Sequence, residues 1–277
     1  MTTKNYTKEE IFAQPEIDHL GTCPLCLQSY GYDPDEYGEN NEVVVTLPCC
    51  SKPLCRTCCY CHGITCAKEG KSVSCPFCRE PYDNKKPETI MTETDYKKLL
   101  HEQIDKKQGR DQYAFRELAR LQLHDDKETA FRYHKKAAQL GNICSMYEVS
   151  IMLRTGQGVT KDRLASKQYC LMASIAGHPN ARVAIAFMEM QEGNIEQGTK
   201  HLEIASAQGS TTAVNRLKEL YNSRCYSKPR LENALRNHYN KREELKVLKD
   251  DREARKKNIT EGWYVFRVNG YGVVAKK

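Results

Sequence analysis

Eight cysteines near the start of this 277-residue chain have the spacing of metal ligands. They form four close pairs: Cys23–Cys26, Cys49–Cys50, Cys55–Cys58 and Cys75–Cys78. When two residues separate a pair, both thiolates can reach one ion at about 2.3 Å without backbone strain. Two pairs complete one tetrahedral site, so the four pairs predict two structural zinc ions.

Composition limits the class of protein around these cysteines. Nothing approaches 18 consecutive apolar residues, so we expect no membrane span. The first ten residues carry acids and lack an apolar segment, which argues against a secretory signal. We therefore expect a cytoplasmic or nuclear protein, in reducing conditions where 14 cysteines do not favour disulfides. The net charge of +7 is interleaved with 36 acidic residues, so a nucleic-acid partner is not expected.

Eleven of the cysteines precede residue 80, which predicts a small metal-stapled domain followed by a region built differently. Residues 23–78 hold too few apolar side chains to fold by burial alone. A domain this small usually needs a structural metal ion or disulfides to be stable. Structural zinc contributes roughly 10–16 kcal/mol in apparent terms. The whole net stability of a typical domain is about 5–15 kcal/mol. Metal should therefore decide whether this region folds.

Between the pairs, the residues predict a loop, a strand and a helix. The stretch from Tyr30 to Glu42 is acidic and rich in Gly, Asn and Asp, so a solvated loop is expected. Residues Val43–Leu47 are mostly β-branched and lead into the second pair, which predicts a short strand. A single helix is expected over Arg56–Lys68, ending at Gly70.

Four further residues of this region carry side chains that can bind metal: Cys59, Cys61, His62 and Cys66. Cys59, His62 and Cys66 share one face of the expected helix, so a third metal site is one interpretation. The other interpretation is that the cysteines are small buried hydrophobes, as free cysteines often are. Cys59 is also an alternative to Cys58 as a ligand.

The order of the pairs resembles that of a RING finger, in which two zinc sites interleave. The resemblance implies that the first and third pairs share one ion and the second and fourth share the other. The implied ligand sets are Cys23, Cys26, Cys55 and Cys58, then Cys49, Cys50, Cys75 and Cys78. Two adjacent cysteines stand where the common pattern has a cysteine and a histidine, as in the all-cysteine variant. The implied fold is a small zinc-stapled α+β finger over residues 19–82.

RING domains act mostly as ubiquitin ligases, which hold a ubiquitin-loaded conjugating enzyme close to a substrate and use no nucleophile of their own. The positions that contact the conjugating enzyme and ubiquitin in this family fall on Leu25, Pro76 and Arg79. One position departs from the family, because His62 stands where a Trp or aliphatic residue is common. The resemblance implies a ligase, and the alternative is a non-enzymatic adaptor that binds proteins.

Past the finger, the sequence repeats itself at intervals of 36 and then 32 residues. Three similar segments end in glycine, and each glycine is followed four residues later by a small side chain and preceded eight residues earlier by a ring. These positions are Gly141, Gly177 and Gly209; Ser145, Ala181 and Ala213; and Tyr133, Tyr169 and His201. Stacked helical pairs have this period, with small residues allowing close packing and glycine ending the second helix.

These units resemble Sel-one-like repeats, relatives of the tetratricopeptide repeat. Their most recognisable stretch is Gly156–Val159, and the third unit lacks this loop, which explains its shorter period. The resemblance spans about 112–222 in roughly three units, with a degraded fourth around Leu231–Tyr239. It implies an all-α solenoid whose concave face binds a protein substrate or scaffold partner, with Cys144 and Cys170 in the helix core. The combination with the finger resembles RING-domain proteins predicted in diatoms and other marine algae.

The chain is therefore expected to be multidomain. The assigned segments are an N-terminal tail (1–18), the finger (19–82), a linker with a capping helix (83–111), the repeats (112–240), and a charged helical extension with a hairpin (241–277). The helix over Thr92–Lys107 is expected to cap the array. The charges of Arg236–Lys257 predict a solvated helix, with a nucleic-acid or nuclear-targeting role as the alternative. Asn269–Gly270 predicts a type I′ hairpin turn, with disorder as the alternative.

Overall fold

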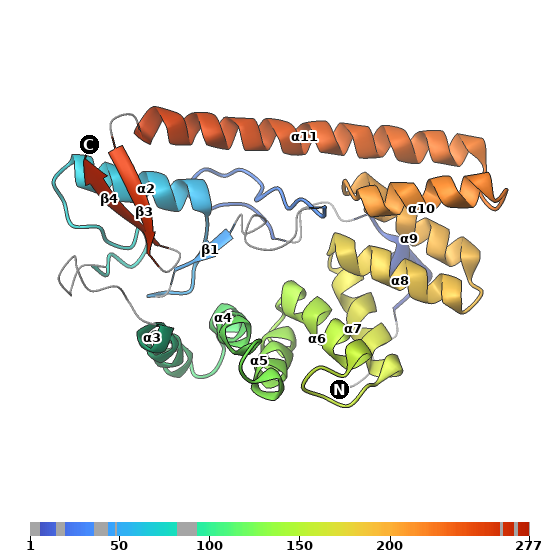
Figure 1. Ribbon diagram of the computed structural model, residues 1–277, viewed down its shortest axis with the longest axis horizontal. Helices are drawn as coiled ribbons and strands as arrows, with labels where there is room; N and C mark the ends of the chain where they lie inside the picture. Colours follow the sequence, from blue (N-terminus) through green and yellow to red (C-terminus); the bar gives the residue numbers. More distant parts are fainter. Residues whose placement is uncertain are drawn as a thin grey trace.

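The computed structural model describes residues 6–14, 20–35, 44–47, 49–81, 93–260, 263–268 and 271–276. The helices are α1 (Lys8–Phe12), α2 (Arg56–Lys68), α3 (Glu93–Lys106), α4 (Gln112–Gln122), α5 (Lys127–Gln139), α6 (Ile143–Thr155), α7 (Arg163–Ile175), α8 (Pro179–Gln191), α9 (Ile195–Ala207), α10 (Thr211–Asn222) and α11 (Lys228–Thr260). The strands are β1 (Val44–Thr46), β2 (Pro53–Cys55), β3 (Trp263–Val268) and β4 (Tyr271–Lys276). Figure 1 shows α3 to α10 as a curved array, with α11 running back from its end toward α2. None of the described helices combines the length and apolarity that a bilayer crossing needs.

The cysteine-rich region forms a small finger around a two-stranded antiparallel sheet. β1 pairs with β2 in a register that sets Val44 opposite Cys55. Cys55 also caps α2, which begins at the next residue. The core of the finger combines cysteines with three buried large side chains, Tyr30, Leu47 and Leu54. The expected helix and strand are both present, although Val43 lies outside the described residues.

From α4 onward, the helices form stacked pairs: α4 with α5, α6 with α7, α8 with α9, and α10 with the first part of α11. The three predicted glycines follow the second helix of a pair, and their φ angles of +97°, +95° and +95° at Gly141, Gly177 and Gly209 lie in the left-handed region. The three small residues are fully buried, as close packing requires: Ser145, Ala181 and Ala213. The predicted helical repeats are confirmed, and the fourth unit is a complete helical pair.

The loop between α6 and α7 is longer than its counterpart between α8 and α9, which consists of residues 192–194. Gly156 and Gly158 of the longer loop both have positive φ. A Cβ atom on Gly158 would lie 2.1 Å from the carbonyl oxygen of Lys127. Glycine therefore allows this loop to reach the start of α5, and the absence of the loop from the third unit accounts for its shorter period.

Two elements lie at the finger end of the array. α3 packs against α4 through Leu100, which is buried in one cluster with Leu118, so α3 covers the first face of the array. β3 and β4 form an antiparallel hairpin in which Val268 pairs with Tyr271, and β4 lies beside α2. The predicted turn residues 269 and 270 lie outside the described residues.

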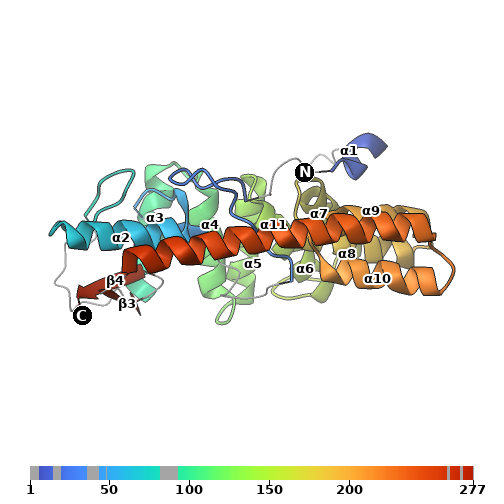
Figure 2. The same cartoon turned by 90° about the horizontal axis from the view of Figure 1, so that it is seen from above.

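The charged segment is helical, as predicted, but it does not extend freely: it is part of α11, a 33-residue helix that joins the array to the finger (Figure 2). Leu245 is 2% exposed, and its methyl carbons lie 3.6 Å and 3.3 Å from where a Cβ would stand on Gly31 and Gly209. What the prediction missed is that apolar residues of α11 pack against glycines elsewhere in the chain. The boundary between residues 240 and 241 falls inside this helix.

The first part of the acidic stretch predicted to be a solvated loop is buried. We call residues 30–35 the acidic strap. Asp33 in it is 1% exposed, and its carboxylate accepts hydrogen bonds from Arg242 at 2.6 Å and Lys249 at 2.8 Å. These two cations come from α11. The stretch is a loop, as predicted, but its solvation was predicted wrongly, because Asp33 meets partners more than 200 residues away. Residues 36–42 lie outside the described residues.

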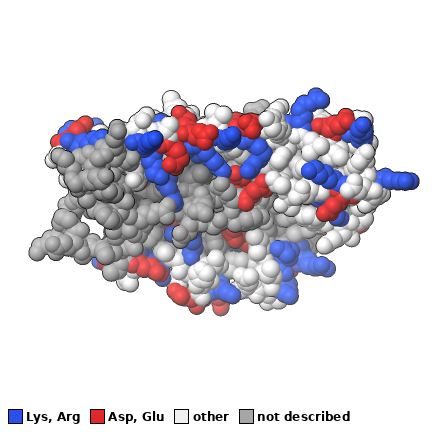
Figure 3. All heavy atoms as spheres, turned by 45° about the horizontal axis from the view of Figure 1, so that its top comes forward, with Lys and Arg blue, Asp and Glu red and all other residues white. Residues whose placement is uncertain are grey.

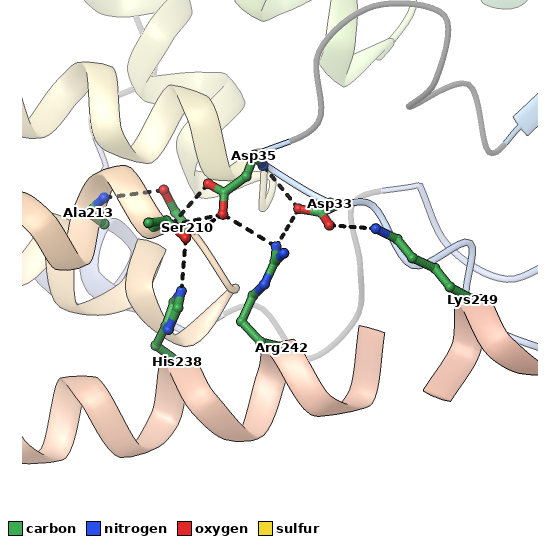
Figure 4. A network of polar contacts seen from close by, with 8 residues as sticks. Asp33, Asp35, Ser210, Ala213, His238, Arg242 and Lys249 are labelled. Atoms are coloured by element: carbon green, nitrogen blue, oxygen red, sulfur yellow. Dashed lines mark hydrogen bonds and ion pairs between the residues drawn. The ribbon is translucent and has the colours of Figure 1, made fainter. Parts of the chain in front are cut away.

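The second acid of the strap lies at the start of a repeat helix. Asp35 accepts hydrogen bonds from the backbone N–H and the hydroxyl of Thr211, the first residue of α10. An anion is favourable there because the first N–H groups of a helix have no partner within it. Figure 4 shows these contacts joined with those of Asp33 in one network. Tyr32 adds a contact to α8, since its hydroxyl accepts a hydrogen bond from Asn180 at 3.1 Å.

Charges of both signs are interspersed on α11. Figure 3 shows Lys and Arg side chains alternating with Asp and Glu over the face along which this helix runs. Several are ion-paired within the helix, including Lys241 with Glu244 and Arg255 with Asp251. Such pairing between charges of opposite sign is typical of a salt-bridged helix.

Candidate metal centre

The eight paired cysteines meet in two groups of four sulfur atoms. Within each group all Sγ atoms lie within 4.8 Å of one another; the groups are Cys23, Cys26, Cys55 and Cys58, and Cys49, Cys50, Cys75 and Cys78. The pairs therefore interleave along the chain, the first with the third and the second with the fourth. Among the residues that the structure describes, no other three His, Cys, Asp or Glu side chains reach this spacing.

The first and fourth pairs share one backbone geometry. In each, the N–H of the first cysteine, Cys23 or Cys75, donates at 2.9 Å to the carbonyl five residues later. The residue four positions later donates back to the carbonyl of the cysteine. That residue closes the turn with a left-handed φ, +58° at Leu27 and +60° at Arg79. The tight turn brings both sulfurs of a pair to one metal position.

The second and third pairs are positioned by the sheet. Cys49 and Cys50 follow β1 in a turn that ends at Ser51, whose φ is +55°. Cys55 is the last residue of β2, and its sulfur accepts a hydrogen bond at 3.3 Å from the backbone N–H of Cys58 in α2. Because β1 and β2 are paired, the second and third pairs are held close together while they serve different groups.

Sulfur atoms this close cannot all be thiolates without a cation. Burial and then the neighbouring thiols raise the pKa of Cys50 to about 11 and that of Cys55 to about 12. Burial also opposes ionisation of Cys26 and Cys75, but hydrogen bonds from backbone N–H groups and neighbouring side chains lower their pKa to about 7. Cys26 in one group and Cys75 in the other are thus readily ionised, and a bound divalent cation would stabilise thiols such as Cys50 and Cys55 as thiolates.

The spacing and chemistry of both groups fit zinc. In a tetrahedral site with Zn–S bonds of about 2.3 Å, the sulfurs lie about 3.8 Å apart. The Cys26 and Cys55 sulfurs are 3.9 Å apart, and those of Cys50 and Cys75 are 3.7 Å apart. A set of four thiolates suits zinc and disfavours the oxygen-seeking ions Mg²⁺ and Ca²⁺. The two groups could therefore hold two metal ions.

The other cysteines of the finger have different surroundings. Cys59 packs partly buried against the apolar core of the finger, which is the surroundings expected of a small hydrophobe. The Nε2 atom of His62 lies 2.7 Å from the carbonyl oxygen of Ser74 and 3.7 Å from the sulfur of Cys66. His62 therefore links α2 to the chain just before the fourth pair. Among the described residues, these side chains do not form a third group.

The three residues predicted to contact a conjugating enzyme differ in exposure. Leu25 is 44% exposed, Arg79 is exposed and Pro76 is partly buried. Leu27, which the sequence did not single out, is 79% exposed. Both leucines lie in the turn of the first pair, so this turn presents apolar side chains next to a metal position.

Sequence reasoning missed the residues that hold the first cysteine group against α11. The side chain of Gln28 donates to Asp251 at 2.8 Å and accepts a hydrogen bond from Arg255. Arg255 also lowers the pKa of Cys26, and Arg252 donates a hydrogen bond to the backbone carbonyl of Ser29. No local pattern distinguishes these arginines from solvated ones.

A lysine anchors the second group. Lys107, at the end of α3, donates a hydrogen bond to the carbonyl oxygen of Cys50 at 2.9 Å. It also pairs with the carboxylate of Asp111 at 2.8 Å, and Asp111 caps α4. Both cysteine groups are therefore tied to the helical part of the chain.

Comparison with known proteins gives no family assignment. No family model matches the chain, and no curated protein matches it. Thirteen chains of solved structures match. One is a Sel1 repeat protein from Oxalobacter formigenes, at 20% identity, a TM-score of 0.45, and coverage of 54% of this chain and 64% of that one. Another is c5321, a protective antigen of uropathogenic Escherichia coli strains with an SLR fold, at 12% identity, a TM-score of 0.46, and coverage of 61% and 40%.

This chain spans less than two thirds of the length of either structure. Its repeat architecture rests on the helical pairs, the left-handed glycines and the buried small residues described above.

Proposed function

We propose that this protein binds two structural zinc ions and acts as a RING-type ubiquitin ligase. One ion would be held by Cys23, Cys26, Cys55 and Cys58, and the other by Cys49, Cys50, Cys75 and Cys78. The interleaving of the two sulfur groups carries the proposal, because it is the arrangement that the resemblance to a RING finger implies. The location is proposed to be cytoplasmic or nuclear.

The chain would supply position rather than a reacting group. Leu25 and Pro76 would contact the conjugating enzyme, and Arg79 would bridge it to ubiquitin. The helical array would hold a protein substrate nearby, so that the reaction gains from proximity and orientation. The docking of the finger on α11 supports this role, since both bound partners would then stand in a defined relation.

A second candidate function is that of an adaptor, in which finger and array each bind a protein and no ubiquitin is transferred. The observation that favours it is His62. Its imidazole is engaged with the Ser74 carbonyl, at a position where an apolar side chain would add contact area. The two functions differ in one measurable step, the release of ubiquitin from a conjugating enzyme.

The test uses the zinc-loaded full chain and a panel of ubiquitin-loaded conjugating enzymes. Native mass spectrometry first establishes the metal content, which we expect to be two zinc ions, lost on addition of a chelator. Discharge of ubiquitin by at least one enzyme should then be accelerated. Replacing Arg79 by glycine removes the side chain at a φ of +60° that glycine adopts without strain. We expect this variant to slow discharge about tenfold or more, equivalent to about 1.4 kcal/mol.

A matched control is Lys71→Ala, which removes another exposed cation from the finger. It should leave discharge unchanged. Two zinc ions without discharge by any enzyme would favour the adaptor, as would equal rates for the Arg79→Gly variant and the unaltered protein. One or three zinc ions per chain would contradict the ligand assignment.

A further inference from the structure

The N-terminal segment of the chain lies on the helical array. Residues 7–13, which we call the N-terminal segment, contain the single-turn helix α1 and contact α7 and α9 (Figure 2). The segment is separated from these helices by more than 140 residues of sequence. Its contacts are specific polar bonds and a ring contact, and they converge on one arginine and one histidine of the array.

The arginine is Arg182, near the start of α8. It is 0% exposed, and burial lowers its pKa to about 10, so it remains charged at neutral pH. Its two Nη atoms donate to backbone carbonyls of the segment, Nη1 to Ile11 and Nη2 to Ala13 at 3.2 Å. No hydrogen-bond partner is present for its Nε atom among the described residues. A buried guanidinium needs acceptors, and here the N-terminal segment supplies them.

The histidine is His201 of α9, which is 2% exposed. Burial and the charge of Arg182 lower its pKa to about 4, so the ring is neutral at pH 7 and its Nδ1, 3.3 Å from Arg182 Nη1, can accept a hydrogen bond. The Phe12 ring packs on it with centroids 4.8 Å apart. Lys200 lies over the same phenyl ring, 5.5 Å from its centroid. Arg182 and His201 thus together contact two backbone carbonyls and one aromatic ring of the segment.

Hydrogen bonds within the N-terminal segment favour the helical turn that it forms on the array. The hydroxyl of Thr7 accepts a hydrogen bond from the N–H of Glu10, and the Glu10 carboxylate accepts one from the N–H of Thr7. This capping box satisfies the first N–H groups of the turn and so favours it before contact with the array. The turn presents Ile11 and Phe12 together with the carbonyls that Arg182 binds.

We propose that the surface of α8 and α9 formed by Arg182 and His201 is a peptide-binding site, and that the N-terminal segment is its intramolecular occupant. The external ligand would be a protein segment of the same chemistry: a capped helical turn of the form Thr-x-x-Glu followed by an aliphatic and an aromatic residue. A short tether gives an attached segment an effective concentration on the order of millimolar. Such a partner therefore has to displace the segment of the chain itself. This inference rests on the recruiting role proposed above and names the place where a substrate would bind.

The test is a binding measurement that involves no ubiquitin. A fluorescent peptide of residues 6–14 is titrated into the full chain and into the double variant Ile11→Lys, Phe12→Lys, whose own segment should leave this surface because its new cations would face Arg182 and Lys200. We expect the double variant to bind the peptide at least about tenfold more tightly than the unaltered chain, because the competitor is gone. A peptide with Ala in place of Phe12 should lose most of this affinity.

Two further substitutions in the double variant test the role of the arginine. Arg182→Met should abolish binding, and Arg182→Lys, which keeps the charge but lacks the planar fork that reaches both carbonyls, should weaken it about fivefold or more. Arg216→Met is the control, because Arg216 lies over the Phe187 ring of the same array and should not affect the peptide.

Amide hydrogen exchange of residues 7–13 in the otherwise unaltered chain gives a second readout, in which Arg182→Lys should raise the exchange rate. Equal affinity of the double variant with and without Arg182→Lys, or no binding by the double variant while it remains folded, would overturn the proposal. Because no conjugating enzyme is present, failure of the ligase function would leave this outcome unaffected.

Discussion

The acidic strap should contribute strongly to stability through Asp33, and Asp33→Asn is the sharpest test. The substitution keeps the shape of the side chain and removes its charge. Asp33 is 1% exposed and accepts hydrogen bonds from Arg242 at 2.6 Å, Lys249 at 2.8 Å and the N–H of Asp35 at 3.1 Å. An asparagine has one acceptor oxygen and would turn its NH₂ group toward one of the two cations.

The expected cost follows from these contacts. A hydrogen bond to a charged group contributes about 1.5–3 kcal/mol, and breaking a fully buried ion pair costs about 3–5 kcal/mol. The side chains of Arg242 and Lys249 are 35% and 40% exposed, so water recovers part of what they lose. We therefore expect Asp33→Asn to lower the free energy of unfolding by about 2–3 kcal/mol, a fall in Tm on the order of 4–12 °C for a chain of this size.

Thermal unfolding of the zinc-loaded protein at pH 7 measures the effect, with Asp125→Asn as the control. Asp125 is exposed in the turn between α4 and α5 and should change stability by less than about 0.5 kcal/mol. Lys249→Met should cost less in the Asp33→Asn background than in the unaltered chain, with a coupling of about 0.5 kcal/mol or more. If Asp33→Asn matched the control, or if the two substitutions were additive, the strap would not hold the finger to α11 as described.

Two other predictions concern the array. Gly158→Ala should destabilise the protein by more than about 2 kcal/mol, because its Cβ would stand 2.1 Å from the Lys127 carbonyl oxygen; Gly193→Ala, at a φ of +88° in open space, should cost only about 1 kcal/mol in the same unfolding assay. Burial and the charge of Arg116 lower the pKa of His134 from 6.5 to about 4, so the unfolded chain takes up the proton first and stability falls as pH drops below 6.5. Replacing His134 by glutamine should remove about 1 kcal/mol of this loss between pH 6.5 and 5.5, measured as a shallower pH profile; an unchanged profile would show that folding does not shift the pKa of this imidazole.

The parts of this structure that the sequence predicted are those determined by near neighbours. A Cys-x-x-Cys turn is closed by bonds within six residues, so the spacing around Cys23 and Cys75 is sufficient to predict it. The helical repeats can be predicted for the same reason. The contacts made by a left-handed glycine, and by the small residue four positions later, lie within one or two repeat units. The sequence alone did not decide whether Cys59 is a metal ligand or a small buried hydrophobe, because its position on a helix face does not show what packs against that face.

The contacts that were missed join segments far apart in the chain. Gln28 meets Asp251, and Arg182 meets the carbonyl of Ile11, at separations of 223 and 171 residues. An arginine that will bind a buried carbonyl has the same local sequence signature as one in water. The charged segment was therefore correctly predicted to be helical, but its composition did not reveal that Leu245 packs against the backbones of Gly31 and Gly209.

These long-range contacts change what the array can do mechanically. In an open solenoid each repeat touches only its neighbours, so curvature changes at little cost and the end units are exposed. Here α3 covers the first pair, and α11 completes the last pair and returns to the finger. The acidic strap then bonds the starts of α8 and α10 as well as α11, so opening the array would break Asp33 and Asp35 from their partners. The finger and the surface of the array around Arg182 are consequently held in a fixed relation by contacts along the whole chain.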